Sequence, residues 1–190
     1  MSVILGVDEV GRGCWAGPLL AGAVVLGERN IVNTTIILDD SKKLTKKQRI
    51  QSNDIIKVQA VDYAIGWVWP EEVDNLGLTK AVRLAMIRAV QKITCEYDQI
   101  IIDGNYNFLS DYSSSSCLIR ADEKIPSVSA ASIIAKVARD EYMNKIAIKY
   151  PGYAFESHVG YGTRKHQQAL QAYGITSLHR KSYKPIQKFL

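Results

Sequence analysis

Residues 3–13 read VILGVDEVGRG, an apolar run that ends on Asp8 and Glu9 and then enters a glycine turn. A short, continuously apolar run of this kind is typical of a buried strand. A carboxylate at the end of such a strand is costly to desolvate unless it is paired or binds a cation. Because ligands of open α/β sheets bind at the carboxyl ends of the strands, this stretch predicts a sheet that presents two acids at a binding edge.

Four downstream segments extend the predicted sheet. PLLAGAVVL (18–26) and VDYAIGWVW (61–69) are apolar or rich in β-branched and aromatic residues, so we expect both to be strands. YDQIIIDG (97–104) and CLIRAD (117–122) are shorter, and each is predicted to be a strand that ends on an acid, Asp103 or Asp122. Residues 29–41 are expected to form a connection that could hold a short strand at 35–38.

Helices are predicted between and after these strands. Thr45 can cap a helix over 46–59 that has Ile50, Ile55 and Ile56 on its buried side. Further helices are expected from Thr79 to about Cys95, over 127–150 with a small-residue face, and from Arg164 to Tyr173. This order of elements predicts a mixed α/β sheet flanked by helices, with a helical C-terminal extension.

The composition fits one globular domain whose surface favours polyanions. The chain has 190 residues, with 24 Lys and Arg against 19 Asp and Glu, a net charge of +5 and a pI of about 9.0. Basic residues concentrate in 42–49 and in 164–188. Three cysteines without a CxxC pair argue against a disulfide framework or a zinc ribbon. The chain has no leader-like run, membrane span or oligomerisation signal, so we expect a soluble, cytoplasmic monomer that does not bind membranes.

The acids at the predicted strand ends form a set of carboxylates without His or Cys. If the strands that carry Asp8 and Asp103 are parallel neighbours, their side chains converge, and Glu9 and Asp122 can join them. Such an all-oxygen site suits Mg²⁺ or Mn²⁺ and disfavours zinc. A pair of these ions can activate water for attack on a phosphodiester. Taken alone, each acid has a simpler explanation, since an Asp before Gly is typical of a turn.

Gly11, Arg12 and Gly13 follow the first two acids directly. Two glycines allow a nucleic-acid backbone to approach the main-chain amides, and Arg12 can contact a phosphate. A lone GxG is also typical of an ordinary tight connection between strands. Its place directly after two acids is what favours binding.

In these motifs the chain resembles the ribonuclease HII family. The matching segments, in order, are GVDEVGRG (6–13), DDSKKLT (39–45), IIDGN (101–105), ADEKIPSVSAASIIAKVARD (121–140), HVGYGT (158–163) and HRKSYKP (179–185). The resemblance implies a ribonuclease H-like, mixed five-stranded sheet flanked by helices. It places the catalytic domain at 1–150 and a helical, substrate-binding extension at 151–190, packed together as one structural unit.

The resemblance also implies an activity. Family members are endonucleases that cleave the RNA strand of RNA:DNA hybrids and nick duplex DNA 5′ to single ribonucleotides, leaving 3′-hydroxyl and 5′-phosphate ends. The resemblance assigns catalysis and the binding of Mg²⁺ or Mn²⁺ to the four acids, Asp8, Glu9, Asp103 and Asp122. It implies that Gly11, Arg12 and Gly13 sense the 2′-hydroxyl. It further implies that Lys42 contacts a phosphate and that Tyr161 stacks on a sugar. Cys14 and Trp15 depart from the family pattern and could alter how the glycine turn packs.

Three alternatives remain at this point. Ribonuclease HIII is a sister family that lacks junction preference, but it typically has an extra N-terminal domain and a different glycine turn. A non-catalytic module could bind hybrids through its basic surface, although four retained acids would weaken its binding to a polyanion. Tyr161 could simply pack the C-terminal extension.

Overall fold

The computed structural model describes residues 2–27 and 44–190 of the chain. Within them, the centre is a five-stranded sheet in the order β3-β2-β1-β4-β5. The strands are β1 (Ile4–Val10), β2 (Leu19–Leu26), β3 (Ala60–Val68), β4 (Gln99–Asp103) and β5 (Ser115–Leu118). The first three strands form an antiparallel meander, whereas β4 runs parallel to both β1 and β5. The predicted mixed sheet is therefore confirmed.

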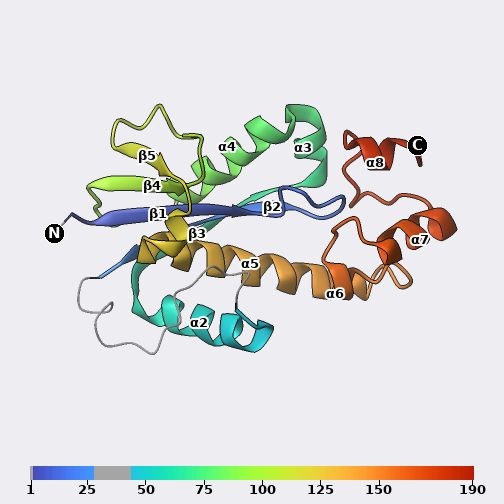
Figure 1. Ribbon diagram of the computed structural model, residues 1–190, viewed down its shortest axis with the longest axis horizontal. Helices are drawn as coiled ribbons and strands as arrows, with labels where there is room; N and C mark the ends of the chain where they lie inside the picture. The colour runs from blue at the N-terminus through green and yellow to red at the C-terminus, as the bar shows by residue number, and fades with distance from the viewer. Residues whose placement is uncertain (1, 28–43) are drawn as a thin grey trace.

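Helices cover both faces of this sheet (Figure 1). Their bounds are α2 (Lys46–Gln59), α3 (Pro70–Leu76), α4 (Leu78–Val90), the 3₁₀ helix η1 (Ala121–Glu123), α5 (Pro126–Ala147), α6 (Phe155–His158), α7 (Arg164–Tyr173) and α8 (Lys184–Gln187). In Figure 1, α3 and α4 lie on one face, α5 and α2 lie on the other, and α6 to α8 gather beyond one end of the sheet. No helix in the described ranges is long and apolar enough to cross a bilayer.

Local sequence signals explain where α2 begins and how α5 packs. Thr45 accepts the backbone N–H of Gln48, and the Gln48 side chain accepts the backbone N–H of Thr45, which makes a reciprocal capping box. Helix α5 lies directly on the sheet, because a Cβ at Gly6 or Gly22 would overlap the α5 backbone at Ser127 or Ala131. The predicted small-residue face of α5 therefore meets two glycines of the sheet.

Three predictions about the elements were wrong in detail. The strand expected to end on Asp122 ends at Leu118, because Arg120 takes a left-handed conformation (φ 55°) that breaks the strand and starts η1. Ile50 is exposed rather than buried, since it lies on a different side of α2 from the buried Ile56. The helix expected to reach Cys95 ends at Val90.

A tertiary contact explains that early end. The Asp62 carboxylate of β3 accepts the backbone N–H of Thr94 at 2.7 Å, which holds the chain in a turn after α4. Helix α3, between β3 and α4, was not predicted. The short strand considered at 35–38 lies outside the described residues.

The C-terminal helices pack on the sheet body through a separate apolar cluster. Its buried members are Ala16, Met143, Tyr153, Phe155, Ala169 and Leu178. Ala16 follows the glycine turn, and Met143 belongs to the second half of α5. The cluster therefore joins the segment after the first strand to residues beyond 150.

Candidate active site

Asp8 and Asp103 lie side by side on neighbouring parallel strands. Val7 of β1 is in register with Ile102 of β4, so the next residue of each strand is an aspartate. Side chains at the same level of two parallel strands leave the sheet on the same side. The convergence expected from the sequence is thus produced by the β1–β4 ladder.

Burial and like charge raise the pKa of two of these acids. Burial raises the pKa of Asp8 well above its usual range, and the nearby charges of Glu9 and then Asp103 add to the effect. Burial also raises the pKa of Glu9, and the charge of Asp103 contributes, while Arg12 opposes the shift. A cation placed among these groups would favour their charged forms, because an opposite charge lowers a carboxyl pKa.

The turn that precedes Asp122 is tied to Asp103. One oxygen of Asp103 accepts the backbone N–H of Ala121 at 2.8 Å, so the end of β4 is tied to the start of η1. Asp122 is the next residue and is only 9% exposed. The structure therefore brings Asp122 to the end of β4 through a 3₁₀ helix rather than through a strand of its own.

Helix α5 borders the acids along one side. Ser132 donates a side-chain hydrogen bond to Asp8, which lowers the pKa of Asp8 and opposes the effects of burial and like charge. One turn later, the Lys136 ammonium lies 6.0 Å from the centre of the Tyr161 ring. Lys136 also pairs with Asp140 at 2.8 Å. One face of α5 thus touches both an acid and the aromatic residue that the sequence singled out.

The glycine turn is close to the acids. The Arg12 guanidinium lies 3.5 Å from Glu9 and 5.9 Å from the centre of the Phe108 ring. Gly11 is buried with φ at +87°, and a Cβ there would meet the side chain of Arg139, whereas Gly13 is exposed with open space around it. The two glycines therefore serve different needs: Gly11 makes room for Arg139, and Gly13 leaves the main chain accessible.

Tyr161 is next to the glycine turn. Its hydroxyl shares a hydrogen bond with Cys14, and burial followed by the Cys14 charge raises the pKa of Tyr161 to about 12. The Tyr161 residue is nonetheless 40% exposed. The preceding carbonyl, Gly160 O, accepts the Trp15 N–H at 2.8 Å. Cys14 and Trp15 are thus contacts that seat Tyr161 and its loop.

Trp15 also packs closely on that loop. A Cβ at Gly162 would overlap the Trp15 ring, and a Cβ at Gly160 would overlap the Ala16 carbonyl. The two glycines of HVGYGT are therefore required by close approach to residues 15 and 16. Trp15 is a packing residue between the glycine turn and the Tyr161 loop.

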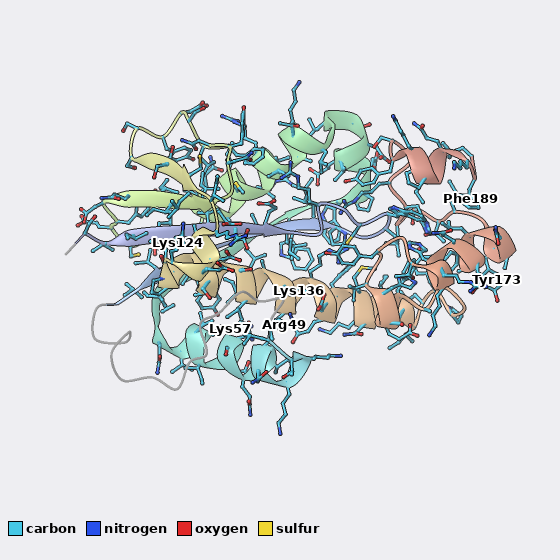
Figure 2. The ribbon with its side chains drawn as sticks, viewed as in Figure 1. Arg49, Lys57, Lys124, Lys136, Tyr173 and Phe189 are labelled. Atoms are coloured by element: carbon cyan, nitrogen blue, oxygen red, sulfur yellow. The ribbon has the colours of Figure 1, made fainter. Side chains whose placement is uncertain are left out.

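Several basic side chains lie on η1, α5 and α2 or next to them. Figure 2 labels Lys124 just after η1, Lys136 on α5, and Arg49 and Lys57 on α2. Lys124 donates to the Ile119 carbonyl at 3.1 Å. Lys42, expected to contact a phosphate, lies outside the described residues.

The donor chemistry of the acids fits a hard divalent cation. Asp8, Glu9, Asp103 and Asp122 offer oxygen ligands only, which suits Mg²⁺ or Mn²⁺. Within residues 2–27 and 44–190, no three His, Cys, Asp or Glu side chains already surround one point as ligands. Burial, and then the like charges of Glu9 and Asp103, raise the pKa of Asp8, and burial and the charge of Asp103 raise that of Glu9. These residues therefore fit a metal by donor type and charge, although their side chains are not arranged as a coordination shell.

Several residues of this region had no role in the sequence analysis. Ser132, Lys136, Arg139, His166, Arg180 and Tyr183 all contact predicted site residues or their turns. Five of them, all except His166, belong to segments quoted for the family resemblance, 121–140 and 179–185. Their motifs were therefore visible, but nothing in the sequence said which group each side chain would touch.

This chain is similar to proteins of known family over nearly its whole length. The family model described as Ribonuclease HII matches residues 5–186. A protein named Ribonuclease HII from Bacillus cereus (strain Q1) is 42% identical over 190 residues, which cover 100% of this chain and 72% of that protein.

Solved structures agree. The crystal structure of ribonuclease H2 from Pyrococcus horikoshii OT3 has a TM-score of 0.87 at 28% identity, covering 98% of this chain and 96% of that one. The structure of Bst-RNase HIII in complex with Mn²⁺ has a TM-score of 0.76 at 21% identity, covers 98% of this chain and 68% of that one, and shares the fold alone. The predicted ribonuclease H-like fold is confirmed.

Proposed function

Because this chain belongs to the ribonuclease HII family, we propose that it nicks duplex DNA on the 5′ side of a single embedded ribonucleotide. Membership makes the chain an endoribonuclease of the ribonuclease H type, which acts on RNA:DNA hybrids. The proposed products carry 3′-hydroxyl and 5′-phosphate ends, and the proposed cofactor is Mg²⁺ or Mn²⁺. The alternative of a non-catalytic binding module is excluded by the family.

The observation that carries this proposal is the contact between the glycine turn and Tyr161. A 2′-hydroxyl is the chemical difference between RNA and DNA, so a nuclease that finds one ribonucleotide must read that group. Gly13 offers an exposed main chain beside the acids, and Tyr161 is hydrogen-bonded to Cys14 of the same turn. If the ribose binds at the glycine turn, the next sugar of the same strand would lie close to the Tyr161 ring. This supports recognition of an RNA-to-DNA junction.

Each part of the site has a proposed task. Asp8, Glu9, Asp103 and Asp122 would hold the cofactor, and two bound ions would supply an activated water and stabilise the leaving oxygen. The amides of Gly11 to Gly13 would donate to the 2′-hydroxyl, while Arg12 would contact a phosphate. Tyr161 would pack on the adjoining sugar. Residues 151–190 would thereby act with residues 1–150 as one substrate-binding unit.

The test compares three duplexes of one sequence: DNA with one ribonucleotide, an RNA:DNA hybrid, and DNA alone. We expect the purified protein to nick the first on the 5′ side of the ribonucleotide with Mg²⁺ or Mn²⁺, to cleave the hybrid, and to leave DNA intact. Gel mapping of end-labelled products checks the position and the ends. Addition of EDTA should stop both reactions. Cleavage of the hybrid without nicking of the single-ribonucleotide duplex would contradict the proposal and favour an activity like that of ribonuclease HIII.

A further inference from the structure

Residues 176–183, called here the 176–183 turn, contact the backbone beside the glycine turn directly and are linked to the Tyr161 loop through His166. The turn is fixed to the segment after the glycine turn: the Gly17 N–H donates to the Leu178 carbonyl at 2.9 Å, and the Arg180 N–H donates to the Trp15 carbonyl at 2.8 Å. Asp74 of α3 accepts the backbone N–H groups of residues 181 and 182, each at 2.9 Å. The turn is therefore held in place from two directions.

Two side chains of this turn hold one carbonyl in the glycine turn. The fully buried Arg180 donates to the Arg12 carbonyl at 3.2 Å and also, through two nitrogens, to the Gly17 carbonyl. The Tyr183 hydroxyl donates to the same Arg12 carbonyl at 2.6 Å and accepts from Arg180 at 2.9 Å. The Arg12 carbonyl thus has two donors from a segment about 170 residues away.

Holding this carbonyl sets the direction of the next amide. The Arg12 carbonyl and the Gly13 N–H belong to one planar peptide unit, and in a trans peptide they point in opposite directions. No peptide bond in the described residues is cis. With the carbonyl held by Arg180 and Tyr183, the Gly13 N–H points away from them, where Gly13 is exposed. A donor that is already oriented costs less entropy on binding than one that must be ordered.

The same turn holds the Tyr161 loop through two histidines. A backbone N–H can only donate, so the Thr176 N–H fixes Nδ1 of His179 as an acceptor, at 2.8 Å. Neutral His179 therefore carries its proton on Nε2 and donates to Nε2 of His166 at 3.0 Å. His166 then donates from Nδ1 to the Tyr161 carbonyl at 2.9 Å. The donor and the acceptor are therefore fixed for each of the three hydrogen bonds between Thr176 and the Tyr161 carbonyl.

We propose that the 176–183 turn positions both substrate-reading elements, with Arg180 and Tyr183 orienting the glycine turn and His179, through His166, orienting the Tyr161 loop. The inference rests on the proposed function, because it assumes that these two elements read the substrate. Arg180, Tyr183, His166 and His179 are positioning residues and need not touch nucleic acid. These residues control how well the protein distinguishes a ribonucleotide from DNA, rather than its general attraction to a polyanion.

Tyr183→Phe tests the first arm with the loss of one oxygen. The matched control is Tyr150→Phe, which removes a hydroxyl that lies 3.4 Å from Ser177 of the same turn but contacts no part of the glycine turn. We expect Tyr183→Phe to lower kcat/KM on the single-ribonucleotide duplex about three- to tenfold, the usual effect of one lost hydrogen bond. Its Kd for the all-DNA duplex should not change, and Tyr150→Phe should change neither value.

His179→Asn and His179→Gln test the second arm as a pair. Asparagine can keep the acceptor for the Thr176 N–H but does not reach His166, whereas glutamine can donate to His166 from the position of Nε2. We expect His179→Asn to reduce the preference for a junction over an all-RNA strand about threefold or more, and His179→Gln to retain most of that preference. Circular dichroism and thermal melting show that each protein compared is folded.

The outcomes separate this inference from the proposed function. If the wild-type protein does not distinguish the single-ribonucleotide duplex from DNA, the proposed function fails. If the wild-type protein does distinguish them, Tyr183→Phe tests the role of Arg180 and Tyr183. Their proposed role is wrong if this variant keeps the wild-type kcat/KM on the single-ribonucleotide duplex, or if it weakens action on that duplex and binding to the all-DNA duplex by the same factor. Equal junction preference in the two His179 variants would overturn the second arm.

Discussion

Asp8 and Asp103 are held by the backbone ladder of the sheet, whereas the glycine turn and Tyr161 are held by side chains from the far end of the chain. The first pair follows from the register of β1 with β4. The second set depends on hydrogen bonds from Arg180, Tyr183 and His166 to main-chain carbonyls. Chemistry and recognition thus rest on separate supports, and it should be possible to damage one while sparing the other.

Asp103→Asn should have the largest effect, because it removes one of the acids that are proposed to carry out catalysis. The amide oxygen can still accept the Ala121 N–H, so the turn into η1 should persist. Loss of one carboxylate from the proposed metal site should reduce cleavage of every substrate by about a hundredfold or more, while binding to the hybrid changes little. Cleavage rates and Kd values are measured on the same preparation.

Asp98→Asn is the matched control, at the residue just before the start of the same strand. Asp98 is exposed and accepts the Val3 N–H at 2.7 Å, a bond that asparagine can keep. This variant should cleave at the wild-type rate. Unchanged turnover in Asp103→Asn would remove Asp103 from the site.

The buried histidines and the buried acids should change the stability of the fold in opposite directions as the pH changes. Burial lowers the pKa of His166 and His179 to about 4, below the ordinary value of 6.5. Between these values the unfolded chain binds more protons than the folded one, so these histidines destabilise the fold as the pH falls from 6.5 toward 4. Asp8 and Glu9 have a raised pKa, so the folded state binds more protons there, and their effect on stability has the opposite sign.

Comparison of His179→Gln with the wild type isolates the histidine effect. The variant lacks one group that must stay neutral, so it should lose less stability than the wild type between pH 7 and pH 5, by about 2 kcal/mol. Urea unfolding at both pH values gives the difference. A pH dependence identical to that of the wild type would show that His179 does not titrate as its burial implies.

Tyr161→Ala should have the smallest of these effects, and it tests whether Tyr161 contributes to recognition of the substrate. Removing the ring should weaken cleavage at a single ribonucleotide by about tenfold more than cleavage of an all-RNA strand, because an aromatic face that packs on a neighbouring sugar is lost. Tyr161→Phe keeps the ring and gives up the bond to Cys14, so it should retain most of the preference. Equal losses on both substrates in the alanine variant would assign Tyr161 to packing.

Sequence reasoning succeeded for the elements with a strong local pattern, although it placed Ile50 on the wrong side of α2. The strands β1 to β3 and the helices α2 and α7 follow from apolar runs and a capping residue. The sequence predicts the convergence of Asp8 and Asp103 only on the condition that their strands are parallel neighbours, and the structure supplies that pairing. Sequence reasoning failed where a distant contact decided the outcome. The helix after Thr79 is shortened by Asp62, and Asp122 is on a 3₁₀ helix because Arg120 turns left-handed.

The sequence by itself determined which residues could do chemistry, since an acid at the end of an apolar strand is a local pattern with a physical cost. It also supplied the family motifs that contain Gly11 to Gly13 and Tyr161. Only the tertiary structure decided what orients them. Arg180 and Tyr183 bind a backbone carbonyl, and so does His166. Every residue has a carbonyl, so such a contact leaves no trace in the sequence of its acceptor, and only folding shows which one is chosen.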